Sequence, residues 1–191
     1  MESNIEIIKA SFIKLIEATD YEKVTISSIC RAAGISRRTF YRYFGGIEQI
    51  VTMLVRDDFI EPVIQIRSIL PIDEIKSAQI LMLERIYAVI YEKRVLYEKL
   101  LDYRGKRSLA EVITEESYTL HLKIYSSFIP DKSELEYASF FTAVSQAMII
   151  DRWIRNEMVI PPKQIAKYAS MWVFAHFREL ASNSERIDKG R

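Results

Sequence analysis

Residues that break helices are scarce in this sequence, which holds five Gly and five Pro among 191 residues. Together they make up about half the share that is usual for a soluble protein. All five prolines lie at or after Pro62, so none interrupts the N-terminal segment. This scarcity predicts an all-α fold, because β-sandwiches and barrels need many turn residues.

Apolar residues recur every three to four positions along most of the chain, which is the spacing of one helix face. The pattern predicts about nine helices in total, over residues 3–18, 25–33, 37–44, a stretch from 47 onward, 73–103, 107–128, 133–156 and 162–181. The helix over 73–103 is either continuous or broken near Lys93. Pro62 either kinks or ends the helix from residue 47, and Pro162 suits a first helical turn. Gly45 is expected to close the preceding helix in a left-handed conformation.

The stretch of residues 25–44 has the layout of a helix-turn-helix, with a capped helix, a glycine turn and a second capped helix. The hydroxyls of Thr25 and Ser36 are placed to accept hydrogen bonds from the first amides of the two helices. Between them, Gly34 permits the positive φ angle that a sharp reversal needs. In DNA-binding proteins such a motif places its second helix in the major groove.

The second helix of this motif separates apolar from basic residues. Phe40 and Phe44 lie four positions apart and are expected to face inward. The helical period then turns Arg37, Arg38, Tyr41 and Arg42 outward and puts Thr39 and Tyr43 on the flanks. Arginine can bind a guanine edge, and hydroxyl groups can bind phosphates. The outward set therefore suits a helix that reads double-stranded DNA.

The net charge of the whole chain is +1, from 27 basic and 26 acidic residues. This value excludes a histone-like polycation. Between Arg31 and Ile47, however, there are four arginines and no acidic residue, so the local net charge is +4. The near-neutral total limits non-specific affinity for DNA, but it does not argue against a specific DNA-binding site in this stretch.

The same stretch resembles the TetR family of transcriptional regulators, whose motif runs close to T-x-x-x-I-A-x-x-A-G-V-S-x-x-T-x-Y-x-Y-F-x-x-K-E-x-L. The sequence matches it at Thr25, Ile29, Ala33, Gly34, Ser36, Thr39, Tyr41, Tyr43, Phe44 and Glu48. The resemblance implies phosphate contacts for Thr25 and Ser36, base or phosphate contacts for Arg37, Arg38 and Arg42, and phosphate or base-edge contacts for Thr39, Tyr41 and Tyr43.

Two residues depart from the family motif. Ile47 stands where the family usually has a lysine, which removes one phosphate contact and leaves open whether DNA binding is weakened. Cys30 replaces a common alanine and is expected to be a packing residue. Farther along, the segment Trp153–Glu157, followed by Pro161 and Pro162, is similar to a TetR subgroup to which dihydroxyacetone-kinase-type regulators belong.

The resemblance implies a helix-turn-helix DNA-binding domain over residues 1–46 and a ligand-binding and dimerisation domain over residues 47–191. In the family, the second domain holds an apolar pocket for a small inducer, and its last two helices form a dimer interface. Candidates for core or pocket positions are Met82, Tyr87, Tyr91, Tyr97, Tyr103, Tyr118, Tyr125 and Met148. The stripes expected at the interface are Ala138, Thr142, Ser145 and Ile149, and then Ile165, Ala169, Trp172 and His176.

The sequence holds no catalytic constellation that we can identify. His121 and His176 lack carboxylates at metal-ligand spacing, so each is expected at the surface or as a hydrogen-bonded core residue. Asp73–Glu74 and Glu115–Glu116 are expected next to helix starts, either as groups that stabilise the helix dipole or as residues of a solvent-exposed face. One cysteine excludes a disulfide framework, and no apolar run approaches the roughly 18 residues that span a membrane. We therefore expect a cytoplasmic protein that is not an enzyme and needs no metal, cofactor or membrane.

Together these features predict a ligand-responsive transcriptional repressor. It would bind a palindromic DNA operator as a homodimer and be released by an unidentified small-molecule inducer. Half-sites are then expected about 34–36 Å apart, or a multiple of that distance. Two alternatives stay open: a transcriptional activator that works with a partner protein, and a helical interaction module whose DNA binding is weakened.

Overall fold

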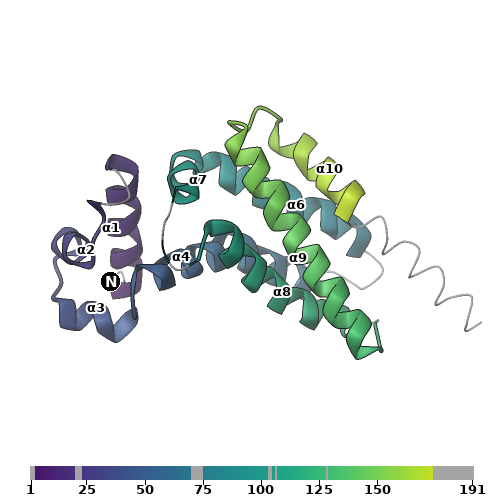
Figure 1. The fold of residues 1–191 in the computed structure, drawn as a ribbon, viewed down its shortest axis with the longest axis horizontal. Helices are drawn as coiled ribbons and strands as arrows, with labels where there is room; N and C mark the ends of the chain where they lie inside the picture. Colours follow the sequence, from purple (N-terminus) through teal and green to yellow (C-terminus); the bar gives the residue numbers. More distant parts are fainter. Residues whose placement is uncertain are drawn as a thin grey trace, which may run out of the picture.

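The computed structural model describes residues 3–19, 23–69, 75–102, 105, 107–127 and 129–173. In these ranges the chain forms helices and no β-strand. Three helices make up a head at one end of the molecule (Figure 1): α1 Asn4–Ala18, α2 Ile26–Ala33 and α3 Arg37–Tyr43. The helical body follows from residue 47 onward.

The body starts with one continuous helical run, α4 Ile47–Val55, the π-helical turn η2 Arg56–Ile60 and α5 Glu61–Ile69. After it come α6 Ile75–Glu92, α7 Arg94–Leu101, α8 Leu109–Tyr125, α9 Lys132–Arg155 and α10 Pro162–Val173. When the continuous run is counted once, the described residues contain nine helices. The predicted all-α architecture, with a helix-turn-helix head and a helical body, is confirmed.

The local predictions around Pro62, Lys93 and Gly45 have different outcomes. Pro62 does not end its helix, which continues to Ile69, but the π-helical turn lies directly before it. A proline has no N–H to donate to the preceding turn, which favours such an irregularity. The break at Lys93 is confirmed. The left-handed conformation expected at Gly45 is wrong: α3 ends on an extended Phe44, with φ −135° and ψ 129°.

Packing within the body joins helices that are distant in sequence. α8 and α9 lie along one another, α10 packs on α6, and α4 contacts both α1 and α8. A single cluster of buried side chains runs from Ile8 in the head to Ala169 in the body. Because the head and body share this core, the division at residue 46 stays a prediction.

The segment that begins with Trp153 turns the chain between α9 and α10. The indole Nε1 of Trp153 donates a hydrogen bond to the carbonyl of Ile160 over 2.8 Å, and its ring meets Tyr87 edge to face at 5.1 Å between ring centres. Glu157 and Met158 both adopt left-handed backbone conformations, with φ 53° and 52°. Trp153 therefore fixes a strained turn against α6.

The expected dimer stripes on α9 and α10 are wrong at three positions, whereas Ala138, Ser145 and Ile149 are half-buried and Trp172 is exposed. Thr142 and Ala169 are completely buried within the subunit, and Ile165 is 5% exposed. They cannot meet a partner, since α9 packs against α8 and α10 packs against α6. The exposed apolar side chains are Tyr137, Phe140, Phe141 and Met148 on α9, and Met171 and Trp172 on α10, and of these Trp172 belongs to the expected stripes. His176 lies outside the described residues.

Candidate nucleic-acid interface and ligand cavity

Side-chain caps and one glycine fix the geometry of the helix-turn-helix. The hydroxyl of Thr25 accepts from the backbone N–H of Ser28 at 3.1 Å, and the hydroxyl of Ser28 accepts from the N–H of Thr25 at 2.9 Å. Gly34 has φ 64° and ψ 29°, the left-handed conformation expected for the turn. The hydroxyl of Ser36 then caps α3 by accepting from the N–H of Thr39 at 3.0 Å.

The two faces of α3 are separated as the sequence predicts. Phe40 and Phe44 are buried, at 0% and 1% exposure, and their ring centres lie 5.8 Å apart. The exposed predicted contact residues are Thr25, Ser36, Arg37, Arg38, Tyr41 and Arg42, whereas Thr39 and Tyr43 are half-buried. All eight therefore lie on the head, on α3 or at the N-terminal caps of α2 and α3. Their individual roles toward DNA stay predictions.

The arginines of α3 differ in their surroundings. Arg37 and Arg38 occupy the first turn, and neither forms a hydrogen bond or ion pair with the residues that the structure describes. Arg42 lies on Tyr43, with its guanidinium carbon 5.0 Å from the ring centre and a nitrogen 3.2 Å from the hydroxyl. The side chains of Arg37 and Arg38 are thus unpaired within the described residues, whereas Arg42 is held by Tyr43.

The hydroxyl of Tyr43 links α1 to α3. Asn4 donates to it at 3.1 Å, and this bond, followed by the one from Arg42, lowers the pKa of Tyr43 below its ordinary value. Since the oxygen accepts both bonds, its own proton is left to donate to an acceptor such as a phosphate. Sequence reasoning missed Asn4 because the contact joins residues 39 positions apart.

Ile47 and Cys30, the two departures from the family motif, both serve packing. Cys30 is buried, as predicted. Ile47 opens α4 and packs, partly buried, against the core. Just before it, the N–H of Gly45 donates to the side-chain oxygen of Gln49 at 2.6 Å. The first turn of α4 is thus held by packing and by Gln49.

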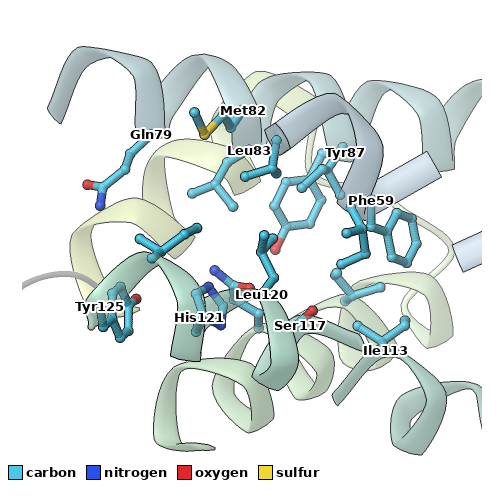
Figure 2. A pocket seen from close by; sticks show the side chains of 16 residues that line it. Phe59, Gln79, Met82, Leu83, Tyr87, Ile113, Ser117, Leu120, His121 and Tyr125 are labelled. Carbon is cyan, nitrogen blue, oxygen red and sulfur yellow. The ribbon is translucent and has the colours of Figure 1, made fainter. Parts of the chain in front are cut away.

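A cavity of about 90 Å³ lies inside the body (Figure 2). Its sixteen lining residues come from η2, α5, α6, α8 and α9. Three of the predicted core or pocket positions line it, Met82, Tyr87 and Tyr125. Tyr97 is instead fully buried in the core, Tyr91 and Met148 are exposed, and Tyr103 lies outside the described residues.

His121 lines this cavity and contradicts the expectation of a surface or hydrogen-bonded histidine. The residue is 6% exposed, its ring stacks on Tyr125 at 5.2 Å, and its Nδ1 has no hydrogen-bond partner in the described part of the chain. Burial lowers the pKa of His121 to about 4, so the imidazole is neutral at pH 7. Sequence reasoning considered His121 alone and missed that Ser117 and Tyr125 lie one turn away on the same helix face.

The buried His121 makes the stability of the protein depend on pH. The unfolded chain takes up a proton near pH 6.5, whereas the folded protein does so only near pH 4, so acid favours unfolding. We expect this group alone to lower the free energy of unfolding by about 2 kcal/mol between pH 7 and pH 5. Urea unfolding at both pH values measures it. His121→Phe should show a smaller difference, and an unchanged difference would contradict the assignment.

The π-helical turn η2 contacts the head, the body and the cavity through successive residues. Lys9 of α1 donates to Asp57 at 2.5 Å. Asp58 is 6% exposed and accepts from Lys93 at 2.6 and 2.9 Å and from the Tyr97 hydroxyl at 2.6 Å. Phe59 and Ile60 line the cavity. η2 therefore connects the helix-turn-helix head to the wall of the cavity.

The acidic pair Glu115–Glu116 lies in the second turn of α8, so the expected position next to a helix start is wrong, whereas Glu115 is exposed as expected for a solvent-facing residue. Glu115 binds Arg107, and Glu116 binds Arg56 of η2 at 3.4 Å. Both carboxylates therefore serve ion pairs. Asp73–Glu74 lies outside the described residues. No helix in the described ranges is long and apolar enough to cross a membrane.

Two family models match successive parts of the chain. Residues 7–53 match the model described as bacterial regulatory proteins, tetR family, and residues 80–173 match that of a transcriptional regulator C-terminal region. Over 56 residues the chain is 34% identical to the HTH-type dhaKLM operon transcriptional activator DhaS of Lactococcus lactis subsp. lactis (strain IL1403). That match covers 29% of this chain and only 30% of the length of that relative.

Solved structures with the same fold extend over nearly the whole chain. The dihydroxyacetone kinase operon activator DhaS has a TM-score of 0.61 at 17% identity, with 92% of this chain and 96% of that chain covered. A tetR-family transcriptional regulator from Streptomyces coelicolor has a TM-score of 0.63 at 15% identity, with coverages of 99% and 87%. The fatty acid degradation regulator FadR from Bacillus halodurans has 0.60 at 14%, with 88% and 96%. With its head and its body matched in turn, this chain belongs to the TetR family of bacterial transcriptional regulators, with an N-terminal DNA-binding domain.

Proposed function

We propose that the protein is a homodimeric repressor in the cytoplasm that binds a palindromic operator and is released by a small molecule. The observation that carries this proposal is the outer face of α3, where Arg37, Arg38, Tyr41 and Arg42 are all exposed above a buried Phe40. Two such helices related by a two-fold axis would enter successive major grooves about 34–36 Å apart. Operator occupancy would then block transcription.

The roles at the interface follow from chemistry and position. Arg37 and Arg38, at the start of the recognition helix, read base edges or hold phosphates. The other residues, Thr25, Ser36, Thr39, Tyr41, Arg42 and Tyr43, position the head on the sugar–phosphate backbone, with Arg42 also able to reach a base. Ser36 and Thr25 act mainly through the helix caps that they already form.

Selection of bound genomic fragments, followed by anisotropy titration of the recovered site, tests DNA binding directly. Arg42→Ala is expected to weaken operator binding by about 1–3 kcal/mol if Arg42 reads a base. Because Arg42 also lies on Tyr43, Tyr43→Phe serves as the comparison: it keeps the ring and removes the hydroxyl. An unchanged affinity of Arg42→Ala would exclude Arg42 from the interface.

A second copy of the chain is the proposed partner of the exposed apolar face of α9 and α10. Met148 is 53% exposed and Trp172 60% exposed, and both line one open groove between the two helices. An exposed apolar patch of this kind is typical of a protein–protein interface. In a two-fold dimer each substitution acts twice, because both subunits present the same surface.

Met148→Glu is therefore expected to give monomers in sedimentation velocity at concentrations where the wild type is dimeric. The introduced carboxylate would be buried without a partner, which costs several kcal/mol. Val95→Glu on α7, an exposed apolar position of 44% exposure on another helix, should leave the dimer intact. A dimer that survives Met148→Glu would place the interface elsewhere.

Coupling between cavity and DNA is proposed to run through η2. A ligand that shifts Phe59 or Ile60 would move the same helical turn whose Asp57 holds Lys9 of the head. The ligand would then favour one spacing of the two heads by binding that arrangement more tightly. π-helical turns inside α-helices frequently lie at functional sites.

The similarity to DhaS favours a second candidate function, activation of transcription, because that relative is named an operon activator. A promoter–reporter strain with and without the gene separates the two: repression predicts higher expression on deletion, activation lower. A third candidate is a helical interaction module with weakened DNA binding, because Ile47 at the start of α4 is half-buried and packed against the core. This candidate is supported if no genomic fragment is selected.

A further inference from the structure

The chemistry of the cavity restricts the molecule that it can hold. Ten of its lining side chains are hydrocarbon or thioether, and none is Asp, Glu, Lys or Arg. The polar groups are few: Gln79, Tyr87, Ser117, His121, Tyr125 and Gln146. A carboxylate, phosphate or ammonium ion in this cavity would lose its hydration without gaining a counter-ion, which is strongly unfavourable. The site therefore selects against charged ligands.

Two polar groups face the cavity from opposite helices. Tyr87 belongs to α6, and its hydroxyl points across the cavity toward α8, where Ser117 and His121 lie (Figure 2). The Nδ1 of His121 has no partner in the described residues although the side chain is more than nine-tenths buried. Leaving such an atom unpaired costs about 1–3 kcal/mol. A ligand that supplies the missing hydrogen bond regains that free energy.

The protonation states of the two groups decide what the ligand must offer. Burial keeps His121 neutral at pH 7, so its imidazole has one donor and one acceptor nitrogen. Burial also raises the pKa of Tyr87 well above its ordinary value, so the phenol keeps its proton and can donate. A single hydroxyl satisfies both residues, since it donates one hydrogen bond and accepts another.

The volume of the cavity limits the size of the ligand. Its volume of about 90 Å³ is below the roughly 150 Å³ of an apolar cavity known to take up benzene. A molecule of about four to six non-hydrogen atoms fits, with its hydrocarbon part against side chains such as Met82, Ile113 and Leu120. A molecule with several oxygens would leave some of them against this apolar wall.

We propose that the cavity binds a small, uncharged alcohol with one hydroxyl group, held between His121 and Tyr87. Only the biological role of the alcohol rests on the proposed function, in which it would be the effector that changes operator binding. Binding itself depends on the cavity alone and can be measured without DNA.

The probe molecules for the test are butan-1-ol, butanoate, butylammonium and dihydroxyacetone, which have similar sizes but differ in charge and oxygen count. The readout is the ¹³C-methyl NMR signal of the methionines in the full-length protein. Met82 lines the cavity, whereas Met148 is exposed on α9 and serves as the internal control. Butan-1-ol is expected to shift the Met82 signal to saturation in the millimolar range and to leave Met148 unchanged.

Two variants of His121 test the hydrogen bond. His121→Gln keeps an acceptor and should bind butan-1-ol within about threefold of wild type. His121→Phe removes it and should bind at least about tenfold more weakly, as expected for the loss of about 1.4 kcal/mol. Far-UV circular dichroism shows whether each variant is folded. If His121→Phe is unfolded, Tyr87→Phe, which removes only the hydroxyl, carries the same expectation.

Saturation of the Met82 signal by butanoate or butylammonium, or tighter binding of dihydroxyacetone than of butan-1-ol, would overturn the proposal. So would the absence of any Met82 shift with butan-1-ol. Anisotropy of operator DNA is followed in the same samples. A Met82 shift without a change in DNA affinity supports the ligand class and contradicts the proposed coupling, whereas a Met82 shift in a protein that binds none of the selected DNA supports the ligand class and contradicts the proposed function.

Discussion

Replacing Arg37 and Arg38 together by alanine is expected to weaken operator binding by about 2–6 kcal/mol, twice the range of a single base-reading arginine. Both lie in the first turn of α3, the part of a recognition helix that contacts base edges. Neither is held by an ion pair in the described ranges, so both are free to bind DNA. Anisotropy titrations of the selected operator at several salt concentrations measure the loss.

The salt dependence separates the two kinds of contact. If both arginines bind phosphates, the slope of log affinity against log salt falls by about 1.8, and if both read bases the slope changes less while sequence preference is lost. The matched control is Arg85→Ala with Arg94→Ala, which removes two exposed arginines from the body. Equal losses in the two double variants would show a general charge effect and contradict recognition by α3.

The head was predictable because local rules determine it. Two hydroxyl caps and one glycine of positive φ fix the turn between α2 and α3, and each of these features depends only on residues that are close together in the sequence. The inward positions of Phe40 and Phe44 follow from helical period alone. The prediction for Gly45 also came from a local rule, which favours a left-handed glycine after a helix. It was wrong because α3 ends on an extended Phe44.

The cavity and the dimer stripes were not predictable because they depend on how distant helices pack. The sequence pattern places Thr142 and Ala169 on small-residue stripes, but it cannot say that α8 and α6 occupy those sides of the helices. Likewise, nothing near His121 in sequence reveals that Tyr87, on another helix, faces the same cavity. Sequence period gives the faces of each helix, and only the tertiary fold assigns their partners.

The ion pair between Asp58 of η2 and Lys93, the residue just before α7, should give a second large effect, on the stability of the protein. Lys93→Met is expected to lower the free energy of unfolding by about 3–5 kcal/mol, because it leaves the buried carboxylate of Asp58 without its cation. The side chain of Asp58 is only 8% exposed, whereas that of Lys93 is 40% exposed. Asp58→Asn should therefore cost less, about 1–3 kcal/mol, since the remaining Lys93 ammonium can turn to water.

Urea unfolding followed by far-UV circular dichroism measures both variants, with Lys99→Met on α7, the helix that follows Lys93, as control. Tyr97 is a further donor to Asp58. Burial, and then the Asp58 carboxylate, raise the pKa of Tyr97 well above its ordinary value, so its phenol keeps the proton that it donates to Asp58. Asp58→Asn keeps an acceptor for it, whereas Lys93→Met leaves it as the carboxylate's remaining side-chain donor in the described residues. If Asp58→Asn lowers the free energy of unfolding more than Lys93→Met does, burial of the Asp58 carboxylate is not what determines the effect of breaking this ion pair. The expected order of the two losses in stability follows from exposure alone, because water can solvate the exposed Lys93 ammonium but not the buried Asp58 carboxylate.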